Sequence, residues 1–265
     1  MTLLAAAVAG RGLVDPAAPV FAADDEALLR GSAAFETLPV YGGRPFRLGP
    51  HVERLRFSAS RLGLPPVEGA EELAELVAAA VPDCVLRLYR TDRDLVATAA
   101  AIPGDLEELR SRGIAVQTVE IGSPLGALAG VKSTSYAFAF TARRDAEASG
   151  ADDVVFTAEG LVLEAATANV WWRAGQALFT PATGASVLPG VTREAVWELA
   201  LELEYEVAEG AFPTTDLLAA DEAFETSSIR EVVPVVTVDG AAIGDGAGGV
   251  AAARLQEALR LLSRP

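Results

Sequence analysis

The chain has 265 residues, which is enough for one large domain or two smaller ones. Hydrophobic residues make up 51% and charged residues 22%, so the chain can bury a core and is not a disordered tail. The 37 acidic and 21 basic residues give a formal net charge of -16, which argues against nucleic acid as a partner because phosphate binding needs cations. The single cysteine, Cys84, cannot form an internal disulfide, and the single histidine, His51, cannot supply a histidine-rich metal site. We therefore expect no metal.

The start of the chain and its apolar runs bear on targeting. Residues 1–10 lack the basic residues that open a secretory signal. No apolar run reaches the roughly 20 residues that a membrane span needs. We expect a cytoplasmic protein with no membrane partner.

The first half of the chain favours short strands joined by glycine turns, followed by helices. Gly10-Arg11-Gly12 and Gly42-Gly43 are typical of hairpin turns. Apolar periodicity predicts strands at 3–8, 33–40, 44–48, 84–89, 94–101 and 114–120, and helices at 50–62 and 71–81.

The second half begins after a stretch without periodicity. Glycine, proline and small residues dominate 121–130, so we expect an N-terminal domain at 1–120, a linker at 121–130 and a C-terminal domain at 131–265. The later patterns predict helices at 135–149, 191–203 and 249–262, and strands at 154–157, 161–165, 168–173, 177–180, 223–226 and 232–238. Strands and helices do not alternate strictly, which favours an α+β fold.

The basic residues carry a further signal. Of the 21 basic residues, 20 are arginine and one is lysine, Lys132. A coding bias toward arginine explains the ratio, but it also raises the question of why one lysine remains. Only a primary amine can lose its proton near neutrality and form an imine, so Lys132 is a candidate covalent catalyst.

Three short segments offer groups for an anionic ligand. Gly190-Val191-Thr192 precedes a helix and Thr226-Ser227-Ser228-Ile229 follows a strand, so both can present N–H groups and hydroxyls to a phosphate. The alternative is an ordinary helix cap and an ordinary turn. Glu164 ends an apolar strand, where its carboxylate is either solvated or paired with a cation in the interior.

Together these groups suit one cofactor. A lysine, a later carboxylate and two turns that bind phosphate are what pyridoxal 5′-phosphate requires. The sequence resembles the fold-type IV, or class IV, pyridoxal-phosphate aminotransferases, which include D-amino-acid aminotransferases, branched-chain aminotransferases and aminodeoxychorismate lyases. The resemblance rests on segments spread over nearly the whole chain: Gly31–Thr37, His51–Leu55, Lys132, Gly160–Ala165 with Asn169, Leu188–Arg193 and Glu231–Val235.

The resemblance implies a fold and roles for individual residues. The fold is the two-domain fold-type IV, with a small N-terminal α/β domain and a larger, mixed C-terminal domain. Lys132 holds the cofactor as an internal aldimine and moves the substrate α-proton, and Glu164 pairs with the pyridinium nitrogen. The implied phosphate ligands, together with a tyrosine near the phenolic oxygen, are Arg54, Val191, Thr192, Ser228, Ile229 and Tyr136.

Arginines suggest how the substrate carboxylate binds. Branched-chain members usually place an aromatic residue just before the Gly31–Thr37 segment, but Arg30 stands there, which argues against that activity. Side chains alternate along 84–90, so Arg87 and Arg90 point to opposite faces and at most one faces the pocket. Some D-amino-acid aminotransferases look similar in carrying arginines near the first segment and on this strand, and Arg30 and Arg90 match them best. Arg230 is a third candidate, and surface cations are the alternative for all three.

The resemblance favours a transaminase that moves an amino group between a D-amino acid and a 2-oxo acid in a ping-pong cycle. Aminodeoxychorismate lyase, forming 4-aminobenzoate and pyruvate, is the alternative, and 168–173 looks like that branch. A branched-chain or (R)-amine transaminase and a non-catalytic scaffold are further alternatives. The resemblance also implies a homodimer whose sites lie between the domains, with Arg30 reaching across from the partner.

Overall fold

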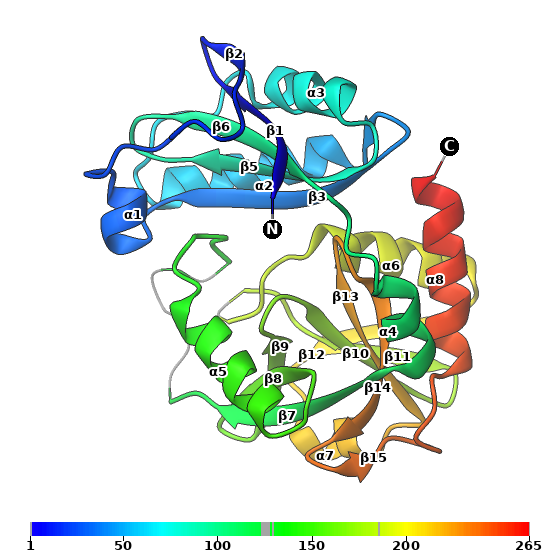
Figure 1. The fold of residues 1–265 in the computed structure, drawn as a ribbon. Helices are drawn as coiled ribbons and strands as arrows, with labels where there is room; N and C mark the ends of the chain where they lie inside the picture. Colours follow the sequence, from blue (N-terminus) through cyan, green and yellow to red (C-terminus); the bar gives the residue numbers. More distant parts are fainter. Residues whose placement is uncertain (1, 123–127, 129, 185, 265) are drawn as a thin grey trace. The chain divides into compact units, whose positions relative to one another are not determined.

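The computed structural model describes residues 2–122, 128, 130–184 and 186–264. The chain forms two compact units, one of Met1–Pro103 with Val131–Tyr136 and Ser263–Pro265, the other of Gly104–Gly130 with Ala137–Leu262. Both units mix helices with an extensive sheet, as expected for an α+β protein (Figure 1). None of the described helices is both long enough and apolar enough to cross a bilayer.

The division of the chain differs from the one expected at 121–130. Strand β7 (Ile114–Glu120) belongs to the second unit, because it pairs in parallel with β14 (Glu231–Val238) and β8 (Asp153–Ala158). Most of the expected linker, 123–127 and 129, lies outside the described residues. The change of unit therefore falls at Pro103, ahead of a short helix, α4 (Leu106–Arg112), that the sequence did not predict.

The first unit is built on an antiparallel sheet of six strands in the order β2-β1-β6-β5-β3-β4. The strands are β1 (Leu3–Val8), β2 (Gly12–Val14), β3 (Ala34–Tyr41), β4 (Arg44–Pro45), β5 (Cys84–Arg90) and β6 (Leu95–Ala100). The predicted strand at 44–48 is shorter than expected, because Leu48 already begins a helix.

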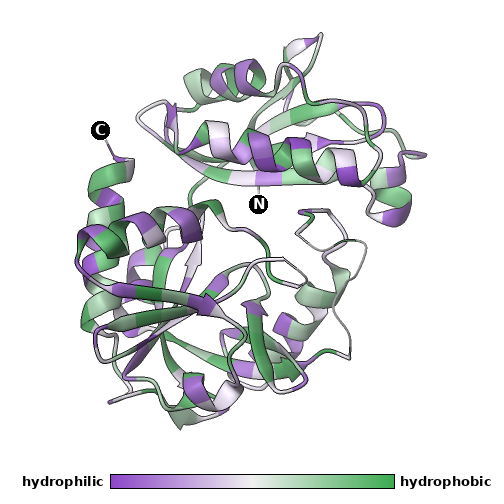
Figure 2. Cartoon of the chain, turned by 180° about the vertical axis from the view of Figure 1, so that it is seen from behind, coloured by the Kyte–Doolittle hydropathy of each residue, from purple (hydrophilic) through white to green (hydrophobic). Residues whose placement is uncertain are grey.

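Two helices, α2 (Leu48–Arg61) and α3 (Ala70–Ala80), cover one face of this sheet (Figure 1). Their apolar residues recur at helical spacing and pack with those of the strands into a single core, which includes Leu55, Val77 and Leu86. Hydrophilic and hydrophobic residues alternate along both helices (Figure 2). The two residues of the hairpin turn, Gly42 and Gly43, both have positive φ, which is why the β3–β4 connection can be so short. A further short helix, α1 (Glu26–Arg30), precedes β3.

The period of two along β3 and β5 decides which side chains face the helices. Ala34, Leu38, Leu86 and Leu88 belong to the core beneath α2 and α3. Residues one position away therefore point to the opposite face of the sheet. We call this second surface, which carries Phe35, Thr37, Arg87 and Tyr89, the open face of the sheet; Phe35 is paired with Tyr89 and Thr37 with Arg87.

The second unit contains a mixed sheet of nine strands. Its remaining strands are β9 (Leu161–Ala165), β10 (Asn169–Ala174), β11 (Ala177–Pro181), β12 (Glu206–Gly210), β13 (Glu222–Ser227) and β15 (Ala241–Ala242). Six of the nine strands of the sheet follow one another in the order β10-β13-β14-β7-β8-β9. The pairing of Glu164 in β9 with Asn169 in β10 closes this path into a ring. The side chains that point into the ring form the main core of the unit, with Val155, Val170 and Val233 among them.

Helices surround this sheet (Figure 1). They are α4, α5 (Ala137–Ala148), α6 (Val191–Glu202), α7 (Thr214–Leu218) and α8 (Val250–Ser263). Helix α6 packs against β13, and α5 packs against β8. Helix α5 begins two residues later than the sequence predicted, because 131–136 is held by hydrogen bonds to the first unit.

Candidate functional site

Lys132 lies in an extended segment beside β3. Its main-chain carbonyl accepts a hydrogen bond from Phe35 at 3.1 Å, and its N–H donates to the hydroxyl of Ser58 at 3.0 Å. The next residue, Ser133, forms an antiparallel bridge with Ala34. The backbone on both sides of the lysine is thus fixed to the sheet, which sets the point from which the side chain leaves.

The ammonium group of Lys132 is surrounded by aromatic rings. Its Nζ lies 3.2 Å from the hydroxyl of Tyr136 and 4.6 Å from the centre of the Phe35 ring. Phe35 in turn stacks on Tyr89 with ring centres 6.2 Å apart and meets Tyr136 edge-on at 5.4 Å. The predicted pair Lys132 and Tyr136 is therefore brought together, and the aromatic residues beside it restrict where the amine can point.

Arg54, a predicted phosphate ligand, belongs to a buried charged group on the helix-covered face. Its Nε and Nη2 donate to the two carboxylate oxygens of Glu36 at 2.8 and 2.7 Å. His51 contributes its Nδ1 at 2.7 Å from the same carboxylate. Burial opposes ionisation of Glu36, but the adjacent Arg54 outweighs it and holds the pKa of the Glu36 carboxyl at about 2.

His51 is neutral in this arrangement. Burial lowers its pKa, and the nearby cations Arg54 and Lys132 lower it further, against the opposing effect of Glu36. A neutral imidazole that faces an ionised carboxylate through Nδ1 carries its proton there. His51 thus donates to Glu36 and helps to orient the carboxylate that orients Arg54.

The two arginines of β5 lie on opposite faces of the sheet, as alternation predicts. Arg90 points toward the helix-covered face, where its Nε donates to the carbonyl of Pro65 at 3.0 Å. Arg87 shares the open face of the sheet with Phe35 and Tyr89, and its charge partly offsets the burial that raises the pKa of the Tyr89 hydroxyl. Alternation directs Arg87, and not Arg90, to the face that carries the ring contacted by Lys132, so Arg87 becomes a further candidate while the assignment of Arg90 stays a prediction.

Arg30, the other predicted substrate residue, ends helix α1. It forms an ion pair with Glu26 one turn earlier, and its side chain is 67% exposed. Gly31 follows with a positive φ of 67°, and an added Cβ there would lie 2.8 Å from the hydroxyl of Ser135. The chain thus passes very close to the lysine-bearing segment immediately after Arg30.

In the second unit, Glu164 and Asn169 hold a loop between them. These two residues are register partners in the pairing that closes the ring. Glu164 Oε2 accepts the main-chain N–H of Leu188 at 2.8 Å, and the side-chain amide of Asn169 donates to the carbonyl of Leu188 at 2.9 Å. Both main-chain groups of Leu188 are satisfied in this way, so the carboxylate of Glu164 has a defined orientation.

The loop leads directly into the N-terminus of α6. Gly190 is the N-cap residue and no side chain caps the helix, so the first-turn N–H groups at Val191 and Thr192 have no intrahelical partner. An added Cβ at Gly190 would lie 2.0 Å from Asn169 Oδ1, so only glycine fits this close approach. An uncapped helix start with a nearby threonine hydroxyl is a suitable phosphate ligand.

The second predicted phosphate segment follows β13. The hydroxyl of Thr226 accepts a hydrogen bond from Trp171 Nε1 at 3.1 Å, which leaves its own proton available to donate. Trp171 also packs against Trp197 of α6, with ring centres 6.1 Å apart. Among the residues that the structure describes, the N–H groups of Ser228 and Ile229 have no hydrogen-bond partner.

Arg230, the third predicted substrate residue, contacts two carboxylates of the second unit. Its Nη1 lies 2.5 Å from Asp153 Oδ2 and its Nη2 lies 2.8 Å from Glu225 Oε2, and the side chain is only 14% exposed. Two carboxylates of the protein thus take up the guanidinium. A role of Arg230 in binding the substrate carboxylate would require it to exchange one of these partners, and that role stays a prediction.

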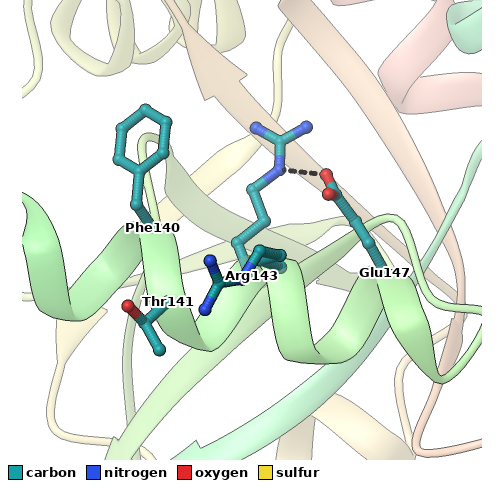
Figure 3. Close-up of a pocket in the computed structure, with 5 residues that line it drawn as sticks. Phe140, Thr141, Arg143 and Glu147 are labelled. Carbon is teal, nitrogen blue, oxygen red and sulfur yellow. Dashed lines mark hydrogen bonds and ion pairs between the residues drawn. The ribbon is translucent and has the colours of Figure 1, made fainter.

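A hollow along α5 is lined by none of the predicted site residues. It is lined by Phe140, Thr141, Arg143, Arg144 and Glu147. Arg143 extends along the helix and donates from Nε to Glu147 at 2.9 Å (Figure 3). One of its terminal nitrogens, Nη1, lies 3.9 Å from Asp153 Oδ2. Arg143 therefore connects the hollow with the buried carboxylates around Arg230.

The sequence did not identify several residues that shape these groups. Trp171 and Thr226 form a hydrogen bond between two strands, which depends on register and cannot be read from spacing. Phe35 lies within a segment used for the resemblance, but its contact with Lys132 spans about a hundred positions of sequence. Alternation predicted that Arg87 and Arg90 lie on opposite faces of β5, but the sequence could not tell which of these faces carries the aromatic ring next to Lys132.

The donors present fit pyridoxal phosphate. The first unit offers a primary amine beside aromatic rings, and the second offers an oriented carboxylate. Within the described part of the chain, the second unit also offers a helix start without a side-chain cap and a turn whose N–H groups have no partner. These are the groups that can bind an aldehyde, a pyridinium nitrogen and a phosphate. The chemistry of the donor set therefore agrees with the cofactor that the sequence implied.

Comparisons with known proteins identify the family. The profile of the family "Amino-transferase class IV" matches residues 33–238. A bifunctional aminodeoxychorismate lyase / D-amino acid transaminase of Mycobacterium tuberculosis is 30% identical over 86% of this chain and 89% of its own length. A putative branched-chain-amino-acid aminotransferase of Methanocaldococcus jannaschii is 30% identical over 88% of each.

A solved structure shows the same fold. The PLP-bound form of a hypothetical aminotransferase from Mycobacterium tuberculosis superposes with a TM-score of 0.88, at 26% identity, over 97% of this chain and 98% of that chain. The expected fold-type IV architecture and the expected cofactor, pyridoxal phosphate, are thereby confirmed. The chain belongs to the class IV aminotransferases.

Proposed function

We propose that this enzyme is a transaminase that moves an amino group between a D-amino acid and a 2-oxo acid in a ping-pong cycle. The observation that carries the proposal is the position of Lys132 Nζ, 3.2 Å from the Tyr136 hydroxyl and above the Phe35 ring. A relative that shares 30% identity is named as a D-amino acid transaminase as well as a lyase, and a D-alanine aminotransferase of Bacillus licheniformis is 26% identical.

Each residue has a defined task in the proposal. Pyridoxal phosphate supplies a carbon that takes up the amino group and a ring that stabilises negative charge at the substrate α-carbon. Lys132 would hold the cofactor through its aldehyde carbon, and its amine, when free, would move the proton at the substrate α-carbon. Tyr136 restrains the amine through its hydroxyl. Glu164, oriented by Leu188, pairs with the ring nitrogen and keeps it protonated.

The remaining residues bind the two anionic groups. Val191, Thr192, Ser228 and Ile229 supply N–H groups and hydroxyls to the phosphate, and Arg54 supplies charge. Arg87 takes over the part that the sequence had given to Arg90, and its guanidinium binds the substrate carboxylate with paired hydrogen bonds. Arg30 stays a candidate second ligand for that carboxylate, contributed by the partner in a homodimer.

A donor panel tests the proposal. D-alanine, D-glutamate, L-leucine and an aromatic (R)-amine are each incubated with 2-oxoglutarate and the purified holoenzyme, and the 2-oxo acid or ketone formed is measured. We expect the D-amino acids to react fastest. Faster reaction of L-leucine or of the (R)-amine overturns the D-amino acid assignment. The Lys132→Ala variant serves as the control and should lose both turnover and the absorbance of the lysine-bound cofactor.

The lyase is the second candidate, because two relatives carry that name. An aminodeoxychorismate lyase of Bacillus subtilis is 27% identical over 84% of this chain, and the bifunctional relative combines both activities. Incubation with aminodeoxychorismate and no amino acceptor separates the candidates. Formation of 4-aminobenzoate and pyruvate, with no turnover of D-amino acids, assigns the lyase instead.

A further inference from the structure

The turn between β13 and β14 is held by several charged side chains, more than a hairpin turn needs to form. It consists of Ser228, Ile229 and Arg230 and contains the proposed phosphate donors. Two arginines anchor it: Arg110 of helix α4 contacts its backbone, and Arg230, the last turn residue, contacts carboxylates of β8 and β13. We call this arrangement the turn clamp.

Arg110 holds the backbone of the turn. Its Nε donates to the carbonyl of Arg230 at 3.0 Å and its Nη2 donates to the carbonyl of Ile229 at 3.3 Å. In a trans peptide the carbonyl and the following N–H point in opposite directions. Because Arg110 draws the Ile229 carbonyl to its side, the N–H of Arg230 is directed away from it. The bonds of Arg110 thus fix the Ile229–Arg230 and Arg230–Glu231 peptide planes, which directly follow the proposed donors.

Arg230 holds the turn from the other direction. Its guanidinium bridges Asp153 in β8 and Glu225 in β13, and the carboxylates are 0% and 1% exposed. A buried arginine with two carboxyl partners cannot change rotamer without giving up its ion pair with Asp153 and its hydrogen bond to Glu225. The residue that ends the turn is therefore anchored to two strands of the ring.

The backbone that follows is also unusual. Glu231 has a positive φ of 59°, which a non-glycine residue adopts only when its surroundings impose it. Its carboxylate lies 2.9 Å from Arg110 Nη2 and bonds the amide of Gln256, whose oxygen accepts the N–H of Val232 at 2.8 Å. The strained residue is thus tied to α4 and α8.

We propose that Arg110 and Arg230 are positioning residues that hold this turn in the conformation presenting its N–H groups and the Ser228 hydroxyl to the cofactor phosphate. The inference rests on the proposed role of Ser228 and Ile229. Neither arginine touches the phosphate. Each acts through the backbone of the turn, and ordering the donors before the cofactor arrives lowers the entropic cost of binding.

The experiment compares two ligands that differ only in the phosphate. The apoenzyme is titrated with pyridoxal 5′-phosphate and with pyridoxal, and the dissociation constant of each is measured by absorbance. Arg110→Met and Arg230→Lys should weaken pyridoxal phosphate by about tenfold and change pyridoxal by less than about twofold. The ³¹P resonance of the bound phosphate should also shift in both variants.

Arg112→Met is the matched control. Arg112 lies on the same helix and likewise bonds a main-chain carbonyl, that of Gly113 at 3.0 Å, and a carboxylate, that of Asp152, but it does not contact the turn. Its dissociation constants should stay within about twofold of the wild-type values. Arg110→Lys keeps the charge beside Glu231 and decides the matter if Arg110→Met does not fold.

The outcomes are separable. Unchanged affinity for pyridoxal phosphate in the folded variants overturns the clamp, as does equal weakening of both ligands, which indicates a general loss of structure. Failure of the wild-type apoenzyme to bind pyridoxal phosphate, by contrast, overturns the proposed function itself.

Discussion

Glu36 receives both arms of the Arg54 guanidinium, with Nε 2.8 Å from Oε1 and Nη2 2.7 Å from Oε2. The carboxylate is fully buried and the arginine side chain is 8% exposed. A buried charge is tolerated only with a partner of opposite sign and good geometry, and this fork provides both. The pairing also fixes the direction of Arg54, which the proposed function assigns to the cofactor phosphate.

Replacing Glu36 with glutamine should destabilise the protein strongly. The Glu36→Gln variant leaves Arg54 buried without a countercharge, and breaking one side of a buried ion pair costs roughly 3–5 kcal/mol. The free energy of unfolding in urea measures this loss. Glu26→Gln is the control, because Glu26 pairs with Arg30 at the surface, where such pairs contribute less than about 1 kcal/mol. Equal losses in the two variants contradict the importance of the buried fork.

The same pair predicts how stability depends on acid. The pKa of Glu36 is lowered from 4.5 to about 2 in the folded protein, so its stabilising contribution is complete above pH 4.5 and is lost as the pH falls toward 2. Unfolding free energies of the wild type and of Glu36→Gln, measured across this range, should converge as the pH falls. A constant difference between the two proteins is the result that contradicts this mechanism.

The regular elements of the first unit could be predicted because alternation and helical spacing are strong there. Strand β5 and helix α3 lie where the periodicity of the sequence placed them. The elements that were missed are short or polar: α1, α4, β12, α7 and β15. Strand β12, for example, has two glutamates among five residues and exists because it pairs in parallel with β11.

The division into units illustrates what a single sequence leaves open. Strand β7 was predicted with the correct bounds but assigned to the wrong part of the chain. Its membership is decided by parallel pairing with β14, more than a hundred residues later, which no local pattern reports. Candidate side chains such as Glu164 could be identified by type, but the Leu188 contact that orients this carboxylate could not.

The choice between Arg87 and Arg90 can be tested by substitution. Arg87→Met should lower kcat/KM for substrates with a carboxylate by about 10-fold to 100-fold, because a charged hydrogen-bond pair is lost. Arg90→Met is the matched control on the same strand, and since Arg90 bonds Pro65 on the other face, its kcat/KM should change by less than about twofold. The reverse order of effects restores the prediction made from the sequence.

Gly190 should not tolerate a side chain. In Gly190→Ala the new Cβ meets Asn169 Oδ1 at 2.0 Å, so the amide must move and its bond to Leu188 weakens. Such overpacking typically costs 1–3 kcal/mol, and we expect the affinity for pyridoxal phosphate to fall with it. Gly104→Ala is the control, because no atom lies within 4 Å of the added Cβ there. Unaltered cofactor affinity in Gly190→Ala shows that the loop adapts and that its contact with Asn169 is not needed.

The contribution of Glu225 to the stability of the fold should depend on pH in the opposite direction from that of Glu36. Burial, reinforced by the charge of Asp153, raises the pKa of Glu225 from 4.5 to about 8, and its buried Oε1 has no hydrogen-bond partner among the described residues. Between these two pH values the folded protein binds more protons than the unfolded chain. The stabilising contribution of Glu225 is therefore complete below pH 4.5 and is lost as the pH rises through 8, by up to about 1.4 kcal/mol per pH unit.

Glu225→Gln cannot ionise and keeps an oxygen for Arg230. Its unfolding free energy, measured by urea titration, should rise relative to the wild type across this range and level off above it. Glu209→Gln, which removes a half-exposed partner of Arg193, should show no such trend, and a flat difference for Glu225→Gln means that Glu225 is already ionised at neutral pH.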